Sequence, residues 1–382
     1  MAASKTSPVI RFPEFKEPWA EERLDFFFIS SRAKGRDGLP TLSVTLDRGL
    51  IDRAVLDRKM ETNLGPDEHL LVRVKDIAYN MMRMWQGAFG RSDREGIVSP
   101  AYVVIRPKGT ANSAYFAYAF RRNRSIYLFW AYSYGITNDR LRLYADDFLR
   151  IPFRAPKVPE QQKIAAFLTA VDGRIEQLSR KKALLEEYKK GVMQQLFTQT
   201  LRFQDDHGHD FPDWEEKPLG SVATLVNGRA YKQNELLSEG PYPVLRVGNF
   251  FSNPEWYYSD LELPKDKYCD TGDLLYAWSA SFGPRIWKGG KVIYHYHIWK
   301  VLPSTLVDKN YLFHFMDWDT ERIKRAQSSG AVMLHVTKQS MEERPMPVPS
   351  LPEQTKIAGF LSALDGKIGA VGEQMRQTQA WK

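Results

Sequence analysis

The chain has 382 residues, of which 43% are hydrophobic and 26% charged, as is typical of a soluble globular protein. Its single cysteine, Cys269, excludes an intramolecular disulfide, and we find neither a secretory signal at the start nor an apolar stretch long enough to cross a bilayer, so we expect a cytoplasmic location. The net charge of +8 at pH 7 favours an acidic partner such as nucleic acid, although many unrelated proteins share that balance.

Residues 1–155 are predicted to form a first globular module of mixed α and β structure. Short β-rich runs, such as residues 101–105, alternate with loops rich in arginine, amide and glycine residues at 31–38, 80–94 and 121–124. Arginine and lysine neutralise phosphate, while Arg, Asn and Gln can form paired hydrogen bonds with base edges. The candidate DNA contacts from these loops are Lys34, Arg36, Asn80, Arg83, Gln86 and Arg91. For each side chain alone, a solvated role or a local ion pair is the competing interpretation.

Residues 156–200 are predicted to form a long connecting helix. Prolines at positions 152, 156 and 159 allow helix to begin only at the last of them, and Glu160 then lies near the positive end of the helix dipole. A continuous helix from Pro159 to Phe197 would be about 58 Å long. Apolar residues recur in it with heptad spacing, which is typical of a coiled-coil seam, at Ile164, Leu168, Val171, Ile175, Leu178 and Leu185.

Residues 201–348 are predicted to form a second α+β module, with a β-rich run at 291–299. Its loops have the same chemistry as those of the first module and supply as candidate DNA contacts Asn227, Arg229, Lys232, Arg246, Asn249, Ser279, Ser281 and Arg285. His295 and His297 would share one face of a strand. We reject a metal site there because no third ligand stands at a recognisable spacing.

Residues 349–382 are predicted to form a second connecting helix that repeats the first. The segment PEQQKIAAFLTAVDGRI at 159–175 returns as PEQTKIAGFLSALDGKI at 352–368, with 12 identities in 17 positions and an offset of 352 − 159 = 193 residues. The second seam consists of Ile357, Leu361, Leu364, Ile368 and Val371. We expect this helix to be shortened, because the sequence contains no counterpart of the KKGVMQQLF run at 189–197.

Two matching apolar stripes favour pairing of the two connectors, although each stripe could instead pack onto its own module. Because modules and connectors alternate, an antiparallel pair with one module at each end is the simplest closed arrangement. The predicted fold class is therefore α+β, with two globular domains separated by two long helices that form an antiparallel coiled coil.

No catalytic signature is found in the sequence. It contains no GxxxxGK[ST] loop, no GxSxG elbow, no HExxH helix and no Asn/Asp-Pro-Pro-Tyr/Phe tetrapeptide of an adenine methyltransferase. We therefore assign no catalytic residue and no metal ligand. The sequence indicates a DNA reader that leaves chemistry to other proteins.

Four runs of the sequence together resemble the specificity subunits of type I restriction-modification enzymes. They are the repeated PEQxKIAxFLxxxDG block, the KKGVMQQLF run, RLRLYADDFLRIP at 140–152 and GIVSPAYVV at 96–104. The resemblance covers nearly the whole chain. The residues that match the spacer motif of the family are Ile164, Leu168, Val171, Ile175, Ile357, Leu361, Leu364 and Ile368.

The resemblance implies a non-catalytic subunit in which two target-recognition domains each read half of a split DNA sequence and two helical spacers set the gap. It implies as partners double-stranded DNA, two methyltransferase subunits and two restriction subunits that can join them, with no membrane. S-adenosylmethionine, ATP and Mg²⁺ would be bound by those partners and no cofactor by this chain. The alternatives are a self-sufficient nuclease or methyltransferase with an unrecognised site, and a coiled-coil scaffold without sequence preference.

Overall fold

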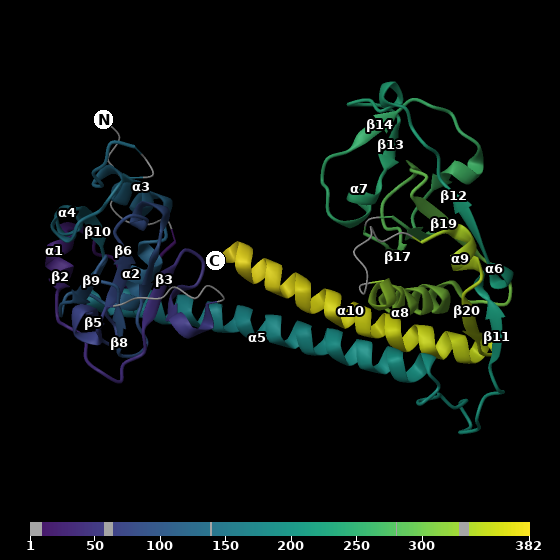
Figure 1. Cartoon of the computed structure of the whole chain (residues 1–382), viewed down its shortest axis with the longest axis horizontal. Helices are drawn as coiled ribbons and strands as arrows, with labels where there is room; N and C mark the ends of the chain where they lie inside the picture. The colour runs from purple at the N-terminus through teal and green to yellow at the C-terminus, as the bar shows by residue number, and fades with distance from the viewer. Residues whose placement is uncertain (1–9, 57–63, 138–139, 280, 328–335) are drawn as a thin grey trace. The chain divides into compact units, whose positions relative to one another are not determined.

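The computed structural model of the chain describes residues 10–56, 64–137, 140–279, 281–327 and 336–382 (Figure 1). Its internal contacts divide it into two compact units, residues 1–174 with Lys382 and residues 175–381. The division falls inside one continuous helix, α5 (Val158–Phe197). The connectors are therefore not compact units of their own, and the four-part division by sequence stays a prediction.

The first module is built around a four-stranded antiparallel sheet of order β2-β9-β6-β7. The strands of this sheet are β2 (Phe28–Ser31), β6 (Ile77–Asn80), β7 (Phe89–Arg91) and β9 (Tyr102–Pro107). Three two-stranded sheets join β1 (Ala20–Arg23) to β10 (Pro152–Ala155), β3 (Leu42–Thr45) to β4 (Gly49–Asp52), and β5 (Leu70–Val72) to β8 (Gly96–Val98). Three consecutive residues of β9 are buried: Val103 and Ile105 lie in the main core of the module and Val104 lies in a smaller cluster, so both faces of the sheet are packed.

Short helices cover the main sheet of the first module, and aromatic rings fill the core between them. The helices are α1 (Leu24–Phe27), α2 (Ser113–Ala119), α3 (Asn123–Ala131) and α4 (Ala145–Arg150), with 3-10 turns at Arg53–Val55, Pro66–Glu68 and Met84–Gln86. Phe116 and Phe120 on one side of α2 meet the rings of Phe28, Phe148 and Phe153. This cluster fixes α2 relative to the sheet and to the start of α5, whose Ala165 lies in the same core.

The second module contains two four-stranded sheets, of order β12-β19-β16-β17 and β14-β13-β18-β15. The first is formed by β12 (Ala223–Asn227), β16 (Leu274–Ala277), β17 (Gly283–Ile286) and β19 (Ile298–Pro303). The second is formed by β13 (Tyr242–Leu245), β14 (Tyr257–Ser259), β15 (Tyr268–Cys269) and β18 (Val292–Tyr294), with β13 and β18 parallel. A separate pair joins β11 (Glu215–Pro218) to β20 (Pro345–Val348).

One long helix, α8 (Lys309–Gln327), dominates the helical layer of the second module. The shorter helices are α6 (Leu219–Val222), α7 (Val247–Phe251) and α9 (Lys338–Glu342), with 3-10 turns at Gln233–Glu235 and Lys265–Lys267. Tyr311, Phe315 and Met316 on α8 are fully buried in a core that also receives the end of α5. The thiol of Cys269 is buried in a second cluster, between the two sheets, and burial raises its pKa to about 12.

The two modules share a plan. In each, the opening strand pairs with the strand that directly precedes a connector, β1 with β10 and β11 with β20. The main sheets also have the same strand order. The order is β2-β9-β6-β7 in the first module and β12-β19-β16-β17 in the second, so that β2 corresponds to β12, β9 to β19, β6 to β16 and β7 to β17. The duplication seen in the connector sequences therefore extends to the modules, whose sequences show it only faintly.

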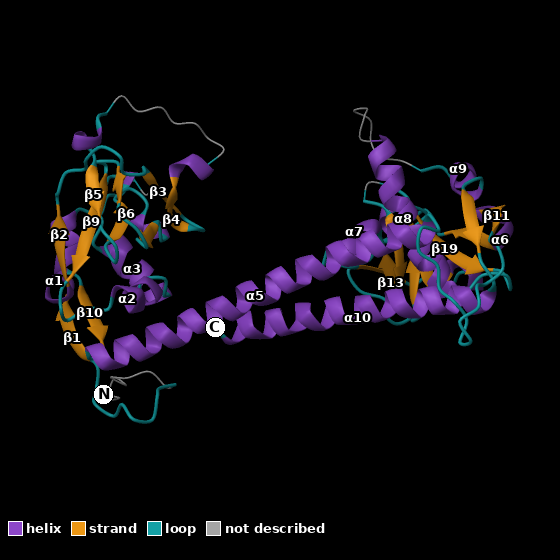
Figure 2. Cartoon of the chain, turned by 90° about the horizontal axis from the view of Figure 1, so that it is seen from below, coloured by secondary structure: helices purple, strands orange, loops and turns teal. Residues whose placement is uncertain are grey.

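The second connector is the helix α10 (Leu351–Trp381), which lies alongside the part of α5 that belongs to the second unit (Figures 1 and 2). Lys189 on α5 pairs with Asp365 on α10, and a Cβ atom at Gly372 would lie 3.7 Å from Cε of Lys182. Residue numbers thus rise on one helix as they fall on the other, so the pair is antiparallel. The chain is α+β with a long helix between two domains, which confirms the predicted fold class.

In the part of the chain that the structure describes, none of the helices is both long enough and apolar enough to span a lipid bilayer.

Candidate DNA-reading surfaces and their helical mounts

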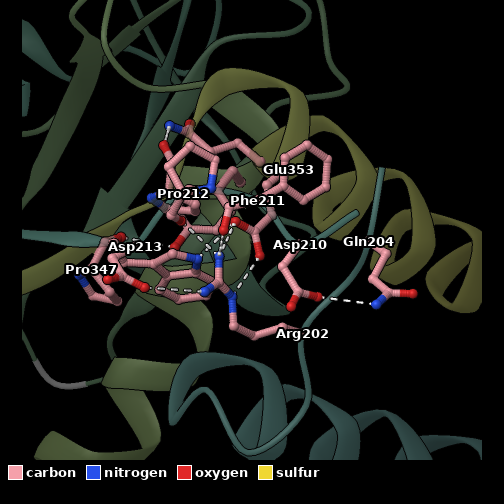
Figure 3. A network of polar contacts seen from close by, with 12 residues as sticks. Arg202, Gln204, Asp210, Phe211, Pro212, Asp213, Pro347 and Glu353 are labelled. Atoms are coloured by element: carbon pink, nitrogen blue, oxygen red, sulfur yellow. Dashed lines mark hydrogen bonds and ion pairs between the residues drawn. The ribbon is translucent and has the colours of Figure 1, made fainter. Parts of the chain in front are cut away.

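Each connector begins with a buried glutamate held by an arginine and a tryptophan from the segment that opens its module. Glu353 accepts hydrogen bonds from Nε and Nη2 of Arg202, at 3.2 and 3.0 Å, and from Nε1 of Trp214, at 2.8 Å (Figure 3). In the first module Glu160 accepts from both Nε and Nη2 of Arg11, each at 2.6 Å. Both carboxylates are almost fully buried, so each depends on its guanidinium.

The glutamine that follows each glutamate ties the connector to its module. The side chain of Gln354 donates to the carbonyls of Pro349 and Leu306, at 2.8 and 3.0 Å, and accepts from the backbone N–H of Asp308 at 2.8 Å. Gln161 makes the same three bonds in the first module, at 2.8, 3.1 and 2.7 Å. The repeated Pro-Glu-Gln motif is therefore a mount, which fixes the direction in which each helix leaves its module.

The predicted seam residues divide between module cores and helix pairing. Ile357, Leu361 and Leu364 lie in the core of the second module together with Val192 and Leu196 from α5. Further along, Leu178 on α5 and Val371 on α10 are 2% and 6% exposed. Half-buried positions are Ile164, which packs on the first core, and Leu168, Val171, Ile175, Leu185 and Ile368. Near the start of each connector, the apolar residues thus pack on the connector's own module, which was the competing interpretation. That the half-buried residues pair the two helices stays a prediction.

A polar layer lies where α5, α8 and α10 meet. Nζ of Lys189 is 2.7 Å from Oδ1 of Asp365 and 3.7 Å from Oδ2 of Asp317. His314 is buried, with Nε2 3.1 Å from the hydroxyl of Ser362. Burial, reinforced by the nearby Lys189 ammonium, lowers the pKa of His314 to about 4, so the ring is neutral at pH 7.

Three of the predicted loops of the second module converge on the turn of residues 295–297, which joins β18 to β19. The N–H of Tyr296 donates to the carbonyl of Arg229 at 3.0 Å, and the N–H of His295 donates to the carbonyl of Leu245, next to Arg246, at 2.9 Å. Nε1 of Trp278 donates to the carbonyl of Tyr296 at 2.8 Å. The loops that begin at Asn227, Arg246 and Trp278 are thereby assembled into one surface.

Glycine at position 228 is required for this convergence. A Cβ atom there would lie 2.3 Å from the carbonyl oxygen of Tyr294 and 2.4 Å from that of His295. Any larger residue would push the arginine-bearing loop away from the 295–297 turn.

The 295–297 turn presents an aromatic and basic surface. The ring of Tyr296 is 37% exposed, and its neighbours are His295 and His297 at centroid distances of 4.5 and 3.9 Å. Burial, the His297 ring and the Arg246 guanidinium lower the pKa of His295 to about 4. A neutral imidazole can both donate and accept hydrogen bonds, as contacts with base edges require.

Several predicted contacts of the second module have intramolecular partners. Arg229 binds both carboxylate oxygens of Glu235, at 2.8 and 3.0 Å, and this pairing lowers the pKa of Glu235 to about 2. The Asn249 amide donates to the carbonyls of Asn253 and Glu255, closing the loop after α7. Arg246 lies over the ring of Tyr257, and Arg285 over the rings of Phe250 and Phe251. The exposed residues are Asn227, Lys232, Arg246, Ser281 and Arg285, whereas Arg229, Asn249 and Ser279 are half-buried.

In the first module, Arg83 and Gln86 are exposed on a tight turn between β6 and β7. Asn80 shapes this turn by accepting from the N–H of Met82 at 2.9 Å, and Gly87 ends it with a φ of 91°. Arg91 donates to the hydroxyl of Ser113 at 3.0 Å. Lys34 and Arg36 belong to a different loop, and Arg36 pairs with Glu95 at 2.7 Å. The structure thus places four of the candidates on the β6–β7 hairpin and two on the loop after β2, and the DNA contacts of all six stay predictions.

The aromatic residues of both surfaces were missed by the sequence analysis. Beside the turn of the first module, α3 exposes Tyr127 and Trp130, 53% and 46% exposed, with their ring centroids 5.9 Å apart and Arg124 over Tyr127. Their three-residue spacing places them on one helix face. In the second module the His-Tyr-His sequence was weighed only as a metal site, although its position between two strands could have identified it as a presented turn.

Comparisons with known proteins agree with this architecture. Residues 212–375 match the sequence model of the type I restriction modification DNA specificity domain. The type I restriction enzyme MjaVIII specificity subunit of Methanocaldococcus jannaschii is 23% identical over 348 residues, covering 83% of this chain and 78% of that subunit. A protein provisionally named as the MjaX specificity subunit of the same organism is 27% identical over 247 residues. That alignment spans 61% of this chain and only 56% of the relative.

Two solved structures share the fold. One is the crystal structure of a type I restriction-modification system S subunit from M. genitalium, with a TM-score of 0.59 and 15% identity over 95% of this chain and 93% of that one. The other comes from work on complex assembly and conformational transition of a type I restriction-modification system, with a TM-score of 0.57 and 17% identity over 96% and 95%. Residues 212–375 thus match a type I restriction modification DNA specificity domain, and the chain as a whole is similar in sequence and fold to type I restriction-modification specificity subunits.

Proposed function

We propose that this chain is the non-catalytic DNA-reading subunit of a type I restriction-modification complex. Each module binds one half of a bipartite double-stranded DNA target, and the connectors keep the two halves at a set spacing. The surfaces that carry the reading are the 295–297 turn with Arg246 in the second module, and the turn that presents Arg83 and Gln86 in the first. The complex works in the cytoplasm.

The single observation that supports this proposal best is the duplicated mount. An arginine, a tryptophan and a glutamine hold each connector in the same way although the loops of the two modules differ. The contacts that hold the two connectors are the same, whereas the loops of the two modules differ. This combination suits a protein that must present two different DNA-reading surfaces in a defined geometry. A scaffold without sequence preference has no need of dissimilar arginine-rich and aromatic loops.

We further propose that the connectors dock two methyltransferase subunits, to which two restriction subunits can be added. S-adenosylmethionine, ATP and Mg²⁺ are then bound by those partners and not by this chain. Incubated alone with DNA and all three cofactors, the purified chain is expected neither to methylate nor to cleave the DNA. Turnover that persists through purification to homogeneity would instead assign an active site to this chain.

A selection experiment tests the reading function. The chain is mixed with the methyltransferase encoded beside it, and bound duplexes are recovered from a random DNA pool and sequenced. The expected result is a motif in two parts separated by a gap of fixed length and free sequence. One contiguous motif, or no enrichment at all, would contradict the proposal.

A further inference from the structure

The helix α3 of the first module has one buried side and one exposed side. On the buried side, the hydroxyl of Ser125 donates to the carbonyl of Ala119 at 2.7 Å. The ring of Phe129 lies 5.4 Å from that of Phe120 and 5.9 Å from that of Phe148. These contacts fix the helix on the core of the module. The face that remains exposed is formed by residues at helical spacing, namely Asn123, Arg124, Tyr127, Trp130 and Ala131.

This exposed face lies next to the turn between β6 and β7. The turn ends at Gly87, and a Cβ atom there would lie 3.4 Å from Cδ1 of Ile126 on α3. Asn123 and Trp130 stand three residues before and four residues after Ile126, so they flank this contact on the helix surface. The turn between β6 and β7 and the exposed face of α3 thus form one surface.

The surface is basic because the segments that build it contain no acidic residue. Residues 77–92 and 96–137 include neither aspartate nor glutamate, although 46 of the 382 residues in the chain are acidic. In the part of the chain that the structure describes, Arg83 and Arg124 form no ion pair with a carboxylate. The surface therefore complements a polyanion such as the phosphate backbone of DNA.

Two aromatic rings stand at the centre of the exposed face of α3. The ring centroids of Tyr127 and Trp130 are 5.9 Å apart, and the guanidinium of Arg124 lies 5.7 Å from the Tyr127 ring. In an intact duplex the bases are stacked on one another, so side-chain rings that enter a groove meet base edges rather than base faces. The apolar group that the major groove presents to such rings is the 5-methyl group of thymine.

We propose that α3 enters the major groove of the half-site bound by the first module and that Tyr127 and Trp130 contact thymine 5-methyl groups there, an assignment that rests on the proposed DNA-reading function. The major groove admits an α-helix. The two rings stand three residues apart, which is about 4.5 Å along the helix axis, so they can reach neighbouring base pairs at ~3.4 Å spacing. Arg124 binds a phosphate beside the groove, because a guanidinium over a ring keeps its N–H donors.

Replacing single thymines of the target by deoxyuridine tests the proposal, because deoxyuridine lacks only the methyl group. The target is first identified by selection from a random DNA pool with the complex of the chain and the methyltransferase encoded beside it. We expect one or two thymines in one half-site at which deoxyuridine weakens binding about fourfold, the effect of one buried methyl group. The Trp130→Ala complex should bind the thymine and deoxyuridine targets equally at one of these positions. Equal sensitivity of the two complexes at every position, or a target without a sensitive thymine, would overturn the proposal.

Matched variants separate loss of a DNA contact from loss of folding, which circular dichroism monitors. Phe26→Ala removes a ring on α1 that is 46% exposed, as Trp130 is, and should change neither the affinity nor the deoxyuridine sensitivity. Trp130→Phe keeps a ring at the position and should restore part of the sensitivity. Arg124→Gln should weaken binding of all sequences about equally and lower the salt slope by about one. Equal effects of Phe26→Ala and Trp130→Ala would contradict a specific contact from α3.

Co-purification distinguishes DNA from a protein partner of α3. The Trp130→Ala chain should still bind the methyltransferase, and loss of that association with unchanged thymine discrimination would instead make α3 a protein-docking surface and refute the proposal. A wild-type complex that selects no two-part motif would contradict the proposed function itself. A normal two-part motif that neither Tyr127→Ala nor Trp130→Ala alters would contradict only the role of α3.

Discussion

At the scale of single residues, the buried carboxylates of Glu160 and Glu353 explain why the Pro-Glu-Gln motif is repeated. A glutamate in the first turn of a helix is commonly a solvent-exposed partner of the helix dipole, worth less than about 1 kcal/mol. Here each carboxylate is buried and bound by a guanidinium and an indole N–H. The motif therefore needs an arginine and a tryptophan that lie far away in sequence.

Arg202→Ala is expected to destabilise the second module by about 3 kcal/mol, because it leaves the Glu353 carboxylate buried without its cation. Urea denaturation followed by tryptophan fluorescence measures the loss. Arg376→Ala is the matched control, since the Arg376–Glu373 pair is exposed on α10 and should change stability by less than about 0.5 kcal/mol. Equal effects of the two variants would mean that burial of the carboxylate does not matter.

His314 makes the stability of the second module depend on pH. Its pKa is about 4 in the folded chain against an ordinary value of 6.5, so the unfolded chain binds the proton more readily between these values. The free energy of unfolding should therefore be highest above pH 6.5 and fall as the pH is lowered toward 4, with a contribution of roughly 3 kcal/mol from this residue.

His314→Gln should flatten that part of the pH profile, which is measured by urea denaturation at a series of pH values. His295, whose pKa is also about 4, contributes in the same direction, so His295→Gln provides a parallel comparison. An unchanged slope in the His314 variant would show that its ring is not the group that takes up the proton.

Tyr296 is expected to contribute to sequence discrimination more than to general affinity. The hydroxyl and ring of Tyr296 can contact base edges in a groove of the duplex, and loss of one base-pair contact costs about 1–3 kcal/mol, so Tyr296→Ala should weaken binding of the cognate target about tenfold and change non-specific binding little. Competition assays at several salt concentrations separate the two effects, because loss of a base contact leaves the salt dependence unchanged. Leu306→Ala, at another exposed position of the module, serves as the control.

At the scale of elements, the heptad pattern serves two kinds of contact along one helix. The first turns of α10 pack into the core of their module, and only later positions such as Val371 face the other connector. Both kinds of contact require apolar residues at the same spacing, which is why periodicity alone leaves them indistinguishable. The antiparallel direction is fixed by the Lys189–Asp365 pair, which would be lost in a parallel alignment.

Leu178→Lys should destabilise the helix pair by about 2–3 kcal/mol, because it replaces a side chain that is 2% exposed with a charge. Lys181→Ala, on the exposed side of the same helix, should have an effect within about 0.5 kcal/mol. Thermal denaturation monitored at 222 nm provides the comparison. Similar melting temperatures for both variants would contradict the pairing of α5 with α10.

At the scale of the whole molecule, the proposed function makes the length of α5 a determinant of the DNA gap. Insertion of seven residues after Leu178 lengthens a helix by about 10 Å and keeps the apolar stripe on the same side. The gap between the two half-sites should then widen by about three base pairs at ~3.4 Å each. Selection from a random DNA pool measures it, and an unchanged gap would show that the connector does not set the spacing.

The sequence by itself determined the periodic and the repeated parts of this protein. The 193-residue repeat, the proline-delimited helix starts and the heptad stripes are local patterns, and each predicts a helix whatever surrounds it. The two-module plan and the antiparallel pairing follow from these patterns because two apolar stripes in one chain can cover each other.

Only the tertiary structure decided which polar side chains are structural and which remain available. The sequence predicts the same role, a DNA contact from a loop, for Arg229 and Arg36. In the structure Arg229 holds its own loop in place by binding Glu235, whereas Arg36 forms an exposed ion pair with Glu95. The partners of Glu160 and Glu353, and the assembly of three loops on the 295–297 turn, join residues tens to more than a hundred positions apart. Such contacts depend on the packing of whole sheets, and no local pattern encodes them.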